Sequence, residues 1–225
     1  MKNKILAIFF LLVSLSVQAQ KKAWVYAAGL SGISLLLYNE ASKDEQRKIY
    51  QANFEGFQTS ADDILQYSPT VINVSMHLLG VQDQVDKKDL LGTFLVGTGT
   101  YFVLTKGLKI SINETRPDGS EHSFPSGHTT TAFFGARMLD KSYGKKYPAI
   151  AIGGYALATA TGAMRLANNK HWASDVFMGA AIGIASAEVA HWVYPKFKKA
   201  INKTALDWEP IVAPNFYAAR VSYNF

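Results

Sequence analysis

The chain has 225 residues, 48% of them hydrophobic and 18% charged, and its formal net charge is +6. This length suits one domain with a real core, and the low charge content favours a closely packed helical bundle or a membrane-associated protein. The absence of cysteine excludes disulfides, thiolate metal sites and cysteine nucleophiles. The mild positive charge fits anionic ligands or lipid headgroups. A nucleic-acid partner is not indicated, because the sequence has no basic run interleaved with aromatic residues.

Residues 1–20 are predicted to be a secretory signal peptide. Lys2 and Lys4 precede a short apolar run, and Ala19 supplies a small residue for cleavage. An uncleaved membrane anchor is the alternative, although the run is short for a span. The prediction places the mature chain on the periplasmic side of the cell envelope, either free or associated with the inner membrane.

Six apolar stretches predict the core of an all-α fold, a compact bundle of about six helices within residues 21–203. Glycine, alanine and serine recur in them, which favours close helix packing. The six stretches are residues 24–38, 70–79, 91–105, 129–139, 147–164 and 176–194. Three charged segments are predicted as connectors, the first of them as a loop or a helix end: residues 39–48, 83–89 and 141–146.

The helices give no clear prediction of membrane crossing. The longest uncharged apolar run, residues 147–164, only reaches the lower limit for a span. Arg137 and Glu188 interrupt two of the other stretches. A compact helical core and a six-span membrane protein therefore both remain open.

The C-terminal tail, residues 204–225, follows a different pattern. Apolar residues alternate over 217–225 and the sequence ends in Phe225, which is strand periodicity. A short edge strand or an ordered tail is the simple interpretation. Such a strand also resembles the last strand of an outer-membrane barrel, but one strand cannot close a barrel.

Lys109 and Arg116 are the first pair of candidate anion-binding residues. They are seven positions apart, close to two helical turns, so they share a face if the helix persists to Arg116. Pro117 would end that helix, and Asp118-Gly119 supplies a turn. Arginine offers a planar fork to two phosphate oxygens and lysine a point charge, although such a pair alone is usually a solvated face.

The tetrapeptide Pro125-Ser126-Gly127-His128 is the second candidate. Ser126 is predicted to cap the helix that follows, and Gly127 allows close approach of the backbone to a ligand. The free N–H groups of that helix start would then cradle an anion beside His128. For this tetrapeptide alone, a plain capped helix with a chance histidine is the favoured interpretation.

Arg165, His171 and Asp175 form the third candidate group. His171 and Asp175 are four positions apart, so they are predicted to meet on one helical face. A carboxylate bonded to one ring nitrogen fixes the tautomer and leaves the other nitrogen as a nucleophile. Residues 168–170 are predicted to form a turn that returns Arg165 to the same place. A surface ion pair is the simple alternative.

Together these groups resemble the motifs of the type 2 phosphatidic acid phosphatase and vanadium haloperoxidase superfamily. Its first motif, Lys, six residues, Arg-Pro, is matched from Lys109 to Pro117, and its second, Pro-Ser-Gly-His, by residues 125–128. Its third motif, Ser-Arg, five residues, His, three residues, Asp, is matched with one departure, since Met164 replaces the serine. The resemblance spans roughly residues 60–195, and three motifs in order are a specific signal.

The resemblance implies a metal-independent phosphatase with an all-helical fold. His171 would be the nucleophile, Asp175 would orient it, and His128 would be the general acid and then the base. The phosphoryl oxygens would be held by Lys109, Arg116, Ser126, Gly127 and Arg165. No cofactor is implied, and vanadate would bind as a phosphate mimic. The other histidines, at positions 77, 122 and 191, have a structural role by default, although His122 lies close to the second motif.

Several functions remain open at this point. The first is hydrolysis of the phosphate monoester or pyrophosphate of an envelope lipid, with membrane association. The second is a soluble periplasmic acid phosphatase that acts on small phosphate esters. A vanadate-dependent haloperoxidase is a third, although such enzymes are usually much longer. A non-enzymatic membrane protein is the fourth, and the complete set of charged residues argues against it.

Overall fold

All six apolar stretches form helices in the computed structural model, which describes residues 23–81, 87–203, 206–213 and 216–223. The predicted signal peptide therefore lies outside the described residues. The prediction of an all-α domain is confirmed. In chain order the helices are α2 (Ala23–Leu37), α3 (Glu40–Asn53), α4 (Ala61–Leu65), α5 (Ser68–Leu78), α6 (Lys87–Ile112), α7 (Gly127–Leu139), the π-helical turn η2 (Asp140–Gly144), α8 (Pro148–Ala167) and α9 (Ala173–Lys203).

Two predicted connectors are helical instead. The charged segment 39–48 belongs to α3, whose start is capped by Asn39, with its side chain accepting a hydrogen bond from Ser42 N at 2.9 Å. Lys43 in this helix is buried and pairs with Glu40 at 2.8 Å, whereas the rest of the segment is exposed or half-buried. Within the third connector, residues 140–144 continue α7 as a π-helical turn. The middle connector falls largely outside the described residues.

Helices α7 and α9 approach closely at two glycines of α9. A methyl group on Gly179 would lie 2.6 Å from the backbone oxygen of Ser126, and one on Gly183 would lie 2.5 Å from that of Thr130. Only glycine fits without displacing backbone at such distances. These contacts fix the start of α7 against the first half of α9.

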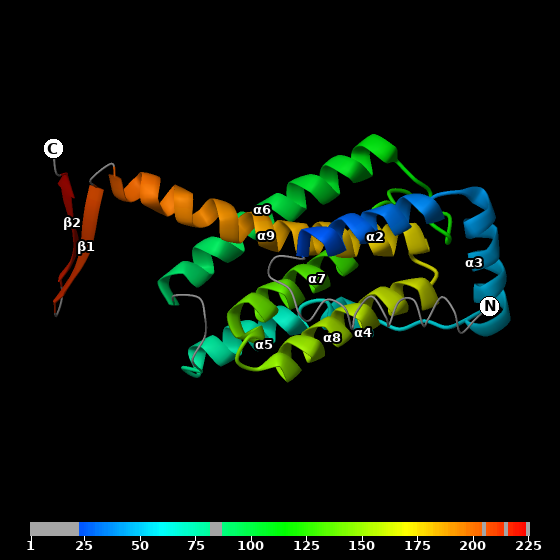
Figure 1. Cartoon of the computed structure of the whole chain (residues 1–225), viewed down its shortest axis with the longest axis horizontal. Helices are drawn as coiled ribbons and strands as arrows, with labels where there is room; N and C mark the ends of the chain where they lie inside the picture. The colour runs from blue at the N-terminus through cyan, green and yellow to red at the C-terminus, as the bar shows by residue number, and fades with distance from the viewer. Residues whose placement is uncertain (1–22, 82–86, 204–205, 214–215, 224–225) are drawn as a thin grey trace.

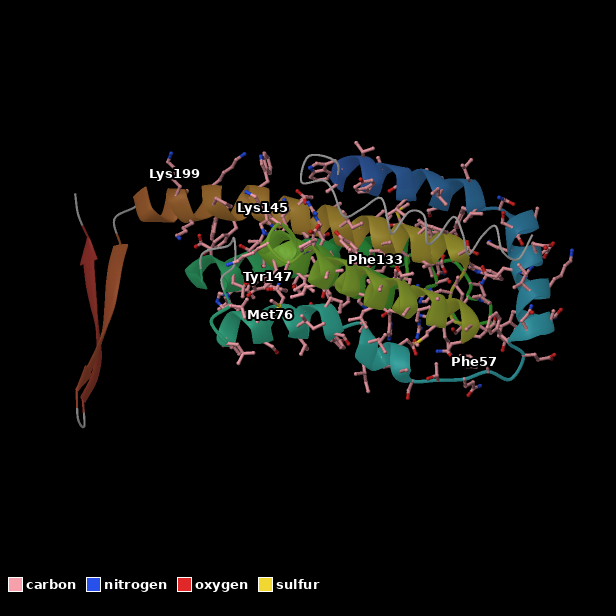
Figure 2. All side chains as sticks on the ribbon, turned by 60° about the horizontal axis from the view of Figure 1, so that its bottom comes forward. Phe57, Met76, Phe133, Lys145, Tyr147 and Lys199 are labelled. Carbon is pink, nitrogen blue, oxygen red and sulfur yellow. The ribbon has the colours of Figure 1, made fainter. Side chains whose placement is uncertain are left out.

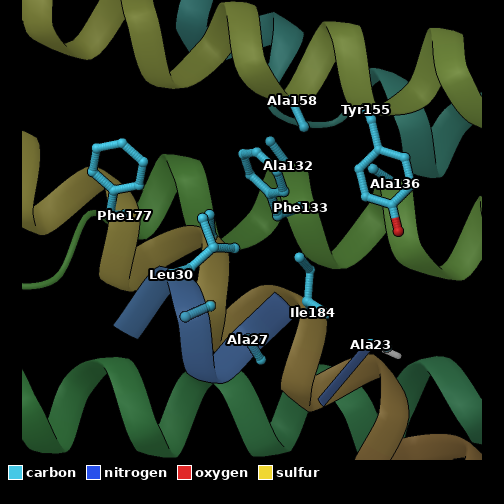
Figure 3. Packing of buried hydrophobic residues seen from close by; sticks show 12 residues of the cluster. Ala23, Ala27, Leu30, Ala132, Phe133, Ala136, Tyr155, Ala158, Phe177 and Ile184 are labelled. Atoms are coloured by element: carbon cyan, nitrogen blue, oxygen red, sulfur yellow. The ribbon is translucent and has the colours of Figure 1, made fainter. Parts of the chain in front are cut away.

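The hydrophobic core lies where α2, α7, α8 and α9 meet (Figure 3). Phe133 of α7 packs near Tyr155 of α8, with their ring centroids 6.3 Å apart. On the other side Leu30 of α2 joins the same buried cluster as Ile184 of α9. Figure 2 shows Phe133 among the side chains that fill the space between the helices. This packing orders the helix ends that carry the candidate site.

The two ends of the molecule differ (Figure 1). Helix α3 stands across one end of the bundle, close to the start of α9 and the end of α8. At the other end α9 projects beyond the bundle toward the C-terminal strands, and Lys199 lies on this projecting part (Figure 2). The candidate site and the C-terminal strands are therefore at opposite ends.

The C-terminal tail forms an antiparallel pair of strands, β1 (Leu206–Ala213) and β2 (Phe216–Tyr223). The predicted alternating strand corresponds to β2. Its pairing with β1, for example Trp208 opposite Val221, was not predicted. Alternation is less regular in β1 because Pro210 and Ile211 follow one another.

One helical segment among the described residues, Ala173–Ala200 of α9, is long and apolar enough to cross a membrane. Its most apolar window is 67% buried inside the bundle. A core helix of a soluble protein has the same properties, so the segment is weak evidence for a span.

Candidate active site

The candidate residues converge at the end of the bundle beside α3. His171 lies in the turn between α8 and α9, and Arg165 lies in the last turn of α8. Lys109 is in the last turn of α6, and Ser126 is the cap of α7. Four helix ends therefore supply most of the residues that the three sequence motifs named.

His171 and Asp175 are in contact, with 3.2 Å between Nδ1 and Oδ2, and both side chains are buried. The predicted pair is present, but the predicted shared helical face is not, because α9 begins only at Ala173. Asp175 lies in the first turn and its carboxylate bonds back to the Trp172 N–H at 2.8 Å, as the acid of a capping box does. Ser123 donates a further hydrogen bond to the same oxygen.

Three groups thus contact Oδ2 of Asp175 and fix the position of its carboxylate. The second oxygen, Oδ1, is buried without a partner in the described chain. With Nδ1 of His171 bonded to Asp175, Nε2 is the nitrogen left for chemistry. Burial, the Asp175 contact, which opposes it, and the Arg165 and Arg116 charges together lower the pKa of His171 to about 4, with burial the largest cause. The ring is therefore neutral at pH 7 and keeps the lone pair that a nucleophile needs.

Arg165 is buried and forms an ion pair with Asp62 of α4. Asn168 donates to the other Asp62 oxygen at 3.0 Å. The predicted turn after α8 is confirmed, since Asn169 has a φ of 58° and the Lys170 N–H bonds to Arg165 O at 3.0 Å. The Nε of Arg165 is buried with no protein partner in the described chain, so this guanidinium has a donor to offer an anion.

Contrary to the prediction, Arg116 and Lys109 do not share a helix face. Helix α6 ends at Ile112, before Arg116, and Asn113 then takes a φ of 46°. Arg116 lies in a turn closed by the Gly119 N–H bonding to its carbonyl at 3.0 Å, so the predicted turn at Gly119 is confirmed. Its Nε is also buried without a protein partner among the described residues.

Lys109 stands over the loop that leads to the second motif. Its Nζ donates to His122 O at 2.6 Å and to Ser123 O at 3.2 Å. Burial, together with the Arg116 charge, lowers the pKa of Lys109 to about 8. Repulsion among the positive charges of Lys109, Arg116 and Arg165 favours binding of an anion between them.

Ser126 caps α7 as predicted, with its side chain accepting from Thr129 N at 3.4 Å. Its own N–H bonds to Asp175 O at 3.0 Å, which joins the second motif to the third. Gly127 begins the helix and has open space where a side chain would be. The helix N-terminus is therefore accessible to an anion.

His128 lies in the first turn of α7 and is partly exposed. Its Nε2 lies 2.7 Å from Oδ1 of Asp63 in α4. Burial and the Arg165 charge lower the pKa of His128, while Asp63 and Asp62 oppose that shift. Ligand atoms of Asp62, Asp63 and His128 lie within 4.8 Å of one another, close enough to reach one cation. The expectation of a metal-independent site stays a prediction.

The PAP2 superfamily model matches residues 113–199, the segment that carries the second and third motifs together with Arg116. Residues 113–199 belong to the PAP2 superfamily. The resemblance found in the sequence is thereby confirmed, and Lys109 lies just before the matched segment.

Known proteins resemble the chain beyond the PAP2 segment. A lipid A 1-phosphatase of Porphyromonas gingivalis is 34% identical over 182 residues, which cover 79% of this chain and 40% of that protein. The crystal structure of a transmembrane PAP2 type phosphatidylglycerolphosphate phosphatase from Bacillus subtilis matches 80% of this chain and 98% of that one, at a TM-score of 0.50 and 22% identity. LpxE of Aquifex aeolicus covers 64% of this chain and 93% of its own, at a TM-score of 0.49 and 23% identity.

The structure adds residues before the PAP2 segment that the sequence analysis did not identify. The Gln46 amide of α3 donates to His171 O at 2.9 Å and accepts from Ala173 N at 2.8 Å, so it holds the turn that carries His171. Asp62 and Asp63 of α4 contact Arg165 and His128. No local pattern marks these three residues, because their partners are more than 60 positions away in the chain.

The three other histidines lie apart from the His171–Asp175 pair. His122 has a φ of 58° and its Nδ1 lies 3.2 Å from Lys109 O, so it borders the site through that lysine. His191 bonds to Ala187 O at 2.8 Å within α9. His77 is in the last turn of α5. Met164, which replaces the family serine, is half-buried in the last turn of α8.

Proposed function

We propose that this protein is a phosphatase that hydrolyses the phosphate monoester or pyrophosphate of an envelope lipid, with a phosphohistidine at His171 as intermediate. The observation that carries this proposal is the buried His171–Asp175 contact beside the Arg116 and Arg165 guanidinium groups. A neutral imidazole whose other nitrogen is held by a carboxylate is a nucleophile, and buried cations suit a phosphoryl dianion.

The residues support a two-step reaction. His171 Nε2 attacks phosphorus, and the bond to the leaving oxygen breaks as that oxygen takes a proton from His128. A water then gives a proton back to His128 and attacks the phosphohistidine, which releases phosphate and restores neutral His171. Asp175 stabilises the positive charge on His171 during the attack.

The phosphoryl oxygens have several donors within reach of this site. Arg116 and Arg165 each keep a buried Nε without a protein partner in the described chain, and Lys109 adds a third positive charge. The start of α7 at Gly127 contributes free N–H groups and the positive end of a helix dipole. Positioning and charge stabilisation are the main requirements of phosphoryl transfer.

A lipid substrate is supported by the outer surface of the bundle. Helix α6 exposes Leu91, Leu95, Phe102, Val103 and Ile110, all more than half exposed. Helices α2 and α5 add Trp24, Leu36, Val71 and Leu78. Large apolar side chains exposed on several helices indicate contact with a membrane or a partner. The similarity to a lipid A 1-phosphatase, which is a lipid phosphatase by name, points to a membrane lipid.

We infer a periplasmic location from the predicted signal peptide and an association with the inner membrane from this apolar surface. Phosphate release from purified protein tests the substrate, and cell fractionation tests the location. We expect faster turnover of lipid phosphates in mixed micelles than of glycerol phosphate, and recovery of the protein with membranes. Equal turnover of both substrates by protein that stays in solution without detergent would favour the soluble acid phosphatase. Oxidation of halide by peroxide with bound vanadate would favour the haloperoxidase.

A further inference from the structure

Both histidines of the site have a carboxylate partner, but they are held at different nitrogens. Asp175 contacts Nδ1 of His171, and Asp63 contacts Nε2 of His128 at 2.7 Å. The first pair is four residues apart, whereas the second joins α4 to α7 across 65 positions of the chain. Asp63 belongs to neither the three motifs nor the segment matched to the PAP2 superfamily.

The placement of Asp63 follows from its neighbours. Asp62 is only 1% exposed and is anchored to Arg165 and Asn168. The Asn168 side chain also accepts from Thr59 N at 2.9 Å and donates to Thr59 O at 2.8 Å. These bonds fix α4 against the end of α8, so the Asp63 carboxylate is presented to His128 by an anchored backbone.

A surface ion pair and a cation site are two simpler interpretations of this arrangement. The side chains of Asp63 and His128 are 60% and 27% exposed, and exposed pairs of this kind usually stabilise a fold little. A small effect on stability leaves a role in orienting the ring open. A bound cation is the second interpretation, but both Asp62 oxygens already bond to Arg165 and Asn168, so a cation would have to compete with the Arg165 charge.

We propose that Asp63 is the positioning residue for His128, holding its Nε2–H so that Nδ1 alone exchanges protons with the substrate and then with water. This inference rests on the proposed function, since it concerns the same reaction. No partner of Nδ1 is present among the described residues, whereas Nε2 has one. A ring held in this way uses the same nitrogen as acid and then as base.

In the first step His171 supplies the electron pair and His128 supplies the proton. The lone pair on His171 Nε2 forms the P–N bond, the P–O bond breaks, and its electron pair stays on the leaving oxygen. That oxygen takes the proton from His128 Nδ1, and His128 becomes neutral with its Nε2–H still bonded to Asp63. In the second step Nδ1 takes a proton from water, the hydroxide oxygen bonds to phosphorus, and the P–N electrons return to His171.

The dependence on the leaving group distinguishes this role from a structural one. An alkyl alcohol needs a proton as it leaves, whereas 4-nitrophenolate needs little help. We expect Asp63→Ala to lower kcat/KM, which reports the reaction through release of the alcohol, for an alkyl phosphate by about 10- to 100-fold while changing kcat/KM for 4-nitrophenyl phosphate less than about threefold. The inhibition constant of vanadate should change little, and Asp63→Glu should recover part of the loss.

The matched control is Glu55→Ala, which removes an exposed carboxylate from the connection that precedes α4, where Figure 2 labels Phe57. This variant should behave as the unchanged protein with both substrates. An equal loss of kcat/KM on both substrates in Asp63→Ala, a change in vanadate affinity alone, or no loss would overturn the inference. A cation site would also overturn the inference. It would be indicated if chelator abolished the activity of the unchanged protein, Zn²⁺ restored that activity, and the activity of Asp63→Ala responded to neither. If the unchanged protein hydrolyses neither substrate, the proposed function itself fails.

Discussion

The carboxylate of Asp175 reaches back past the start of its own helix to the ring of His171, with 3.2 Å between Oδ2 and Nδ1. The same oxygen accepts the Trp172 N–H and the Ser123 hydroxyl. One side chain thus begins α9, joins it to the loop before α7, and orients the proposed nucleophile.

Replacement of Asp175 by Asn should slow the chemical step. The amide keeps the size of the side chain but cannot stabilise positive charge on His171, so we expect kcat to fall by about a hundredfold or more. Steady-state kinetics with 4-nitrophenyl phosphate measure the change, and KM should vary only severalfold. A loss that appeared in KM alone would contradict the orienting role.

Replacement of Arg116 by Ala should weaken anion binding. Hydrogen bonds to charged groups contribute about 1.5–3 kcal/mol, which corresponds to about a 10- to 100-fold loss of affinity. Vanadate, as a phosphate mimic, provides the probe, and its inhibition constant is the measurement. Lys170→Ala is the control, because Lys170 is exposed and pairs with Asp118 at 2.9 Å. Equal vanadate affinity in Arg116→Ala would remove this arginine from the anion site.

The pH profile should be bell-shaped and centred at acidic pH. Since the pKa of His171 is lowered to about 4, the nucleophile is neutral above that pH and kcat/KM should rise through it. His128 must carry a proton to act as an acid, and its pKa lies below the ordinary value of 6.5, so kcat/KM should fall as pH rises through that lowered pKa. Lys109, with a pKa of about 8, loses its charge above that pH, which weakens phosphate binding further. A maximum above pH 8 would contradict these assignments.

The close approach of α7 and α9 predicts a large difference between two glycines. Gly183→Ala should lower the free energy of unfolding by about 1–3 kcal/mol, because the new methyl group meets Thr130 O at 2.5 Å. Gly153→Ala in α8 should be neutral or stabilising, since a methyl group there meets nothing within 4 Å and alanine favours a helix. Thermal or denaturant unfolding compares the two variants, and equal stability would contradict the described packing.

The six core helices and the three motifs could be predicted because their signals are local. Ser126 as a cap, Gly119 in a turn and the four-residue spacing of His171 and Asp175 depend on near neighbours. The spacing did not reveal that His171 precedes its helix. The four-residue spacing is the same for two residues inside a helix and for a residue before the helix that contacts a capping side chain in its first turn.

The residues that the sequence did not reveal act through distant partners. Helix α3 is rich in charge from Glu40 to Lys48, and only folding shows that Lys43 is buried and that Gln46 holds the turn at His171. Asp62 and Asp63 resemble ordinary acids at a helix start. Their contacts with Arg165 and His128 depend on how α4 packs against α7 and α8, and spacing along the chain carries no information on that.

The most direct test of the proposed reaction is to trap the phosphorylated enzyme. Protein mixed with ³²P-labelled substrate is quenched in alkali, where phosphohistidine survives, and the label is located by peptide mapping. We predict label on His171 in the unchanged protein and none in His171→Ala. Label on another residue, or rapid turnover by His171→Ala, would contradict the assignment of His171 as the nucleophile.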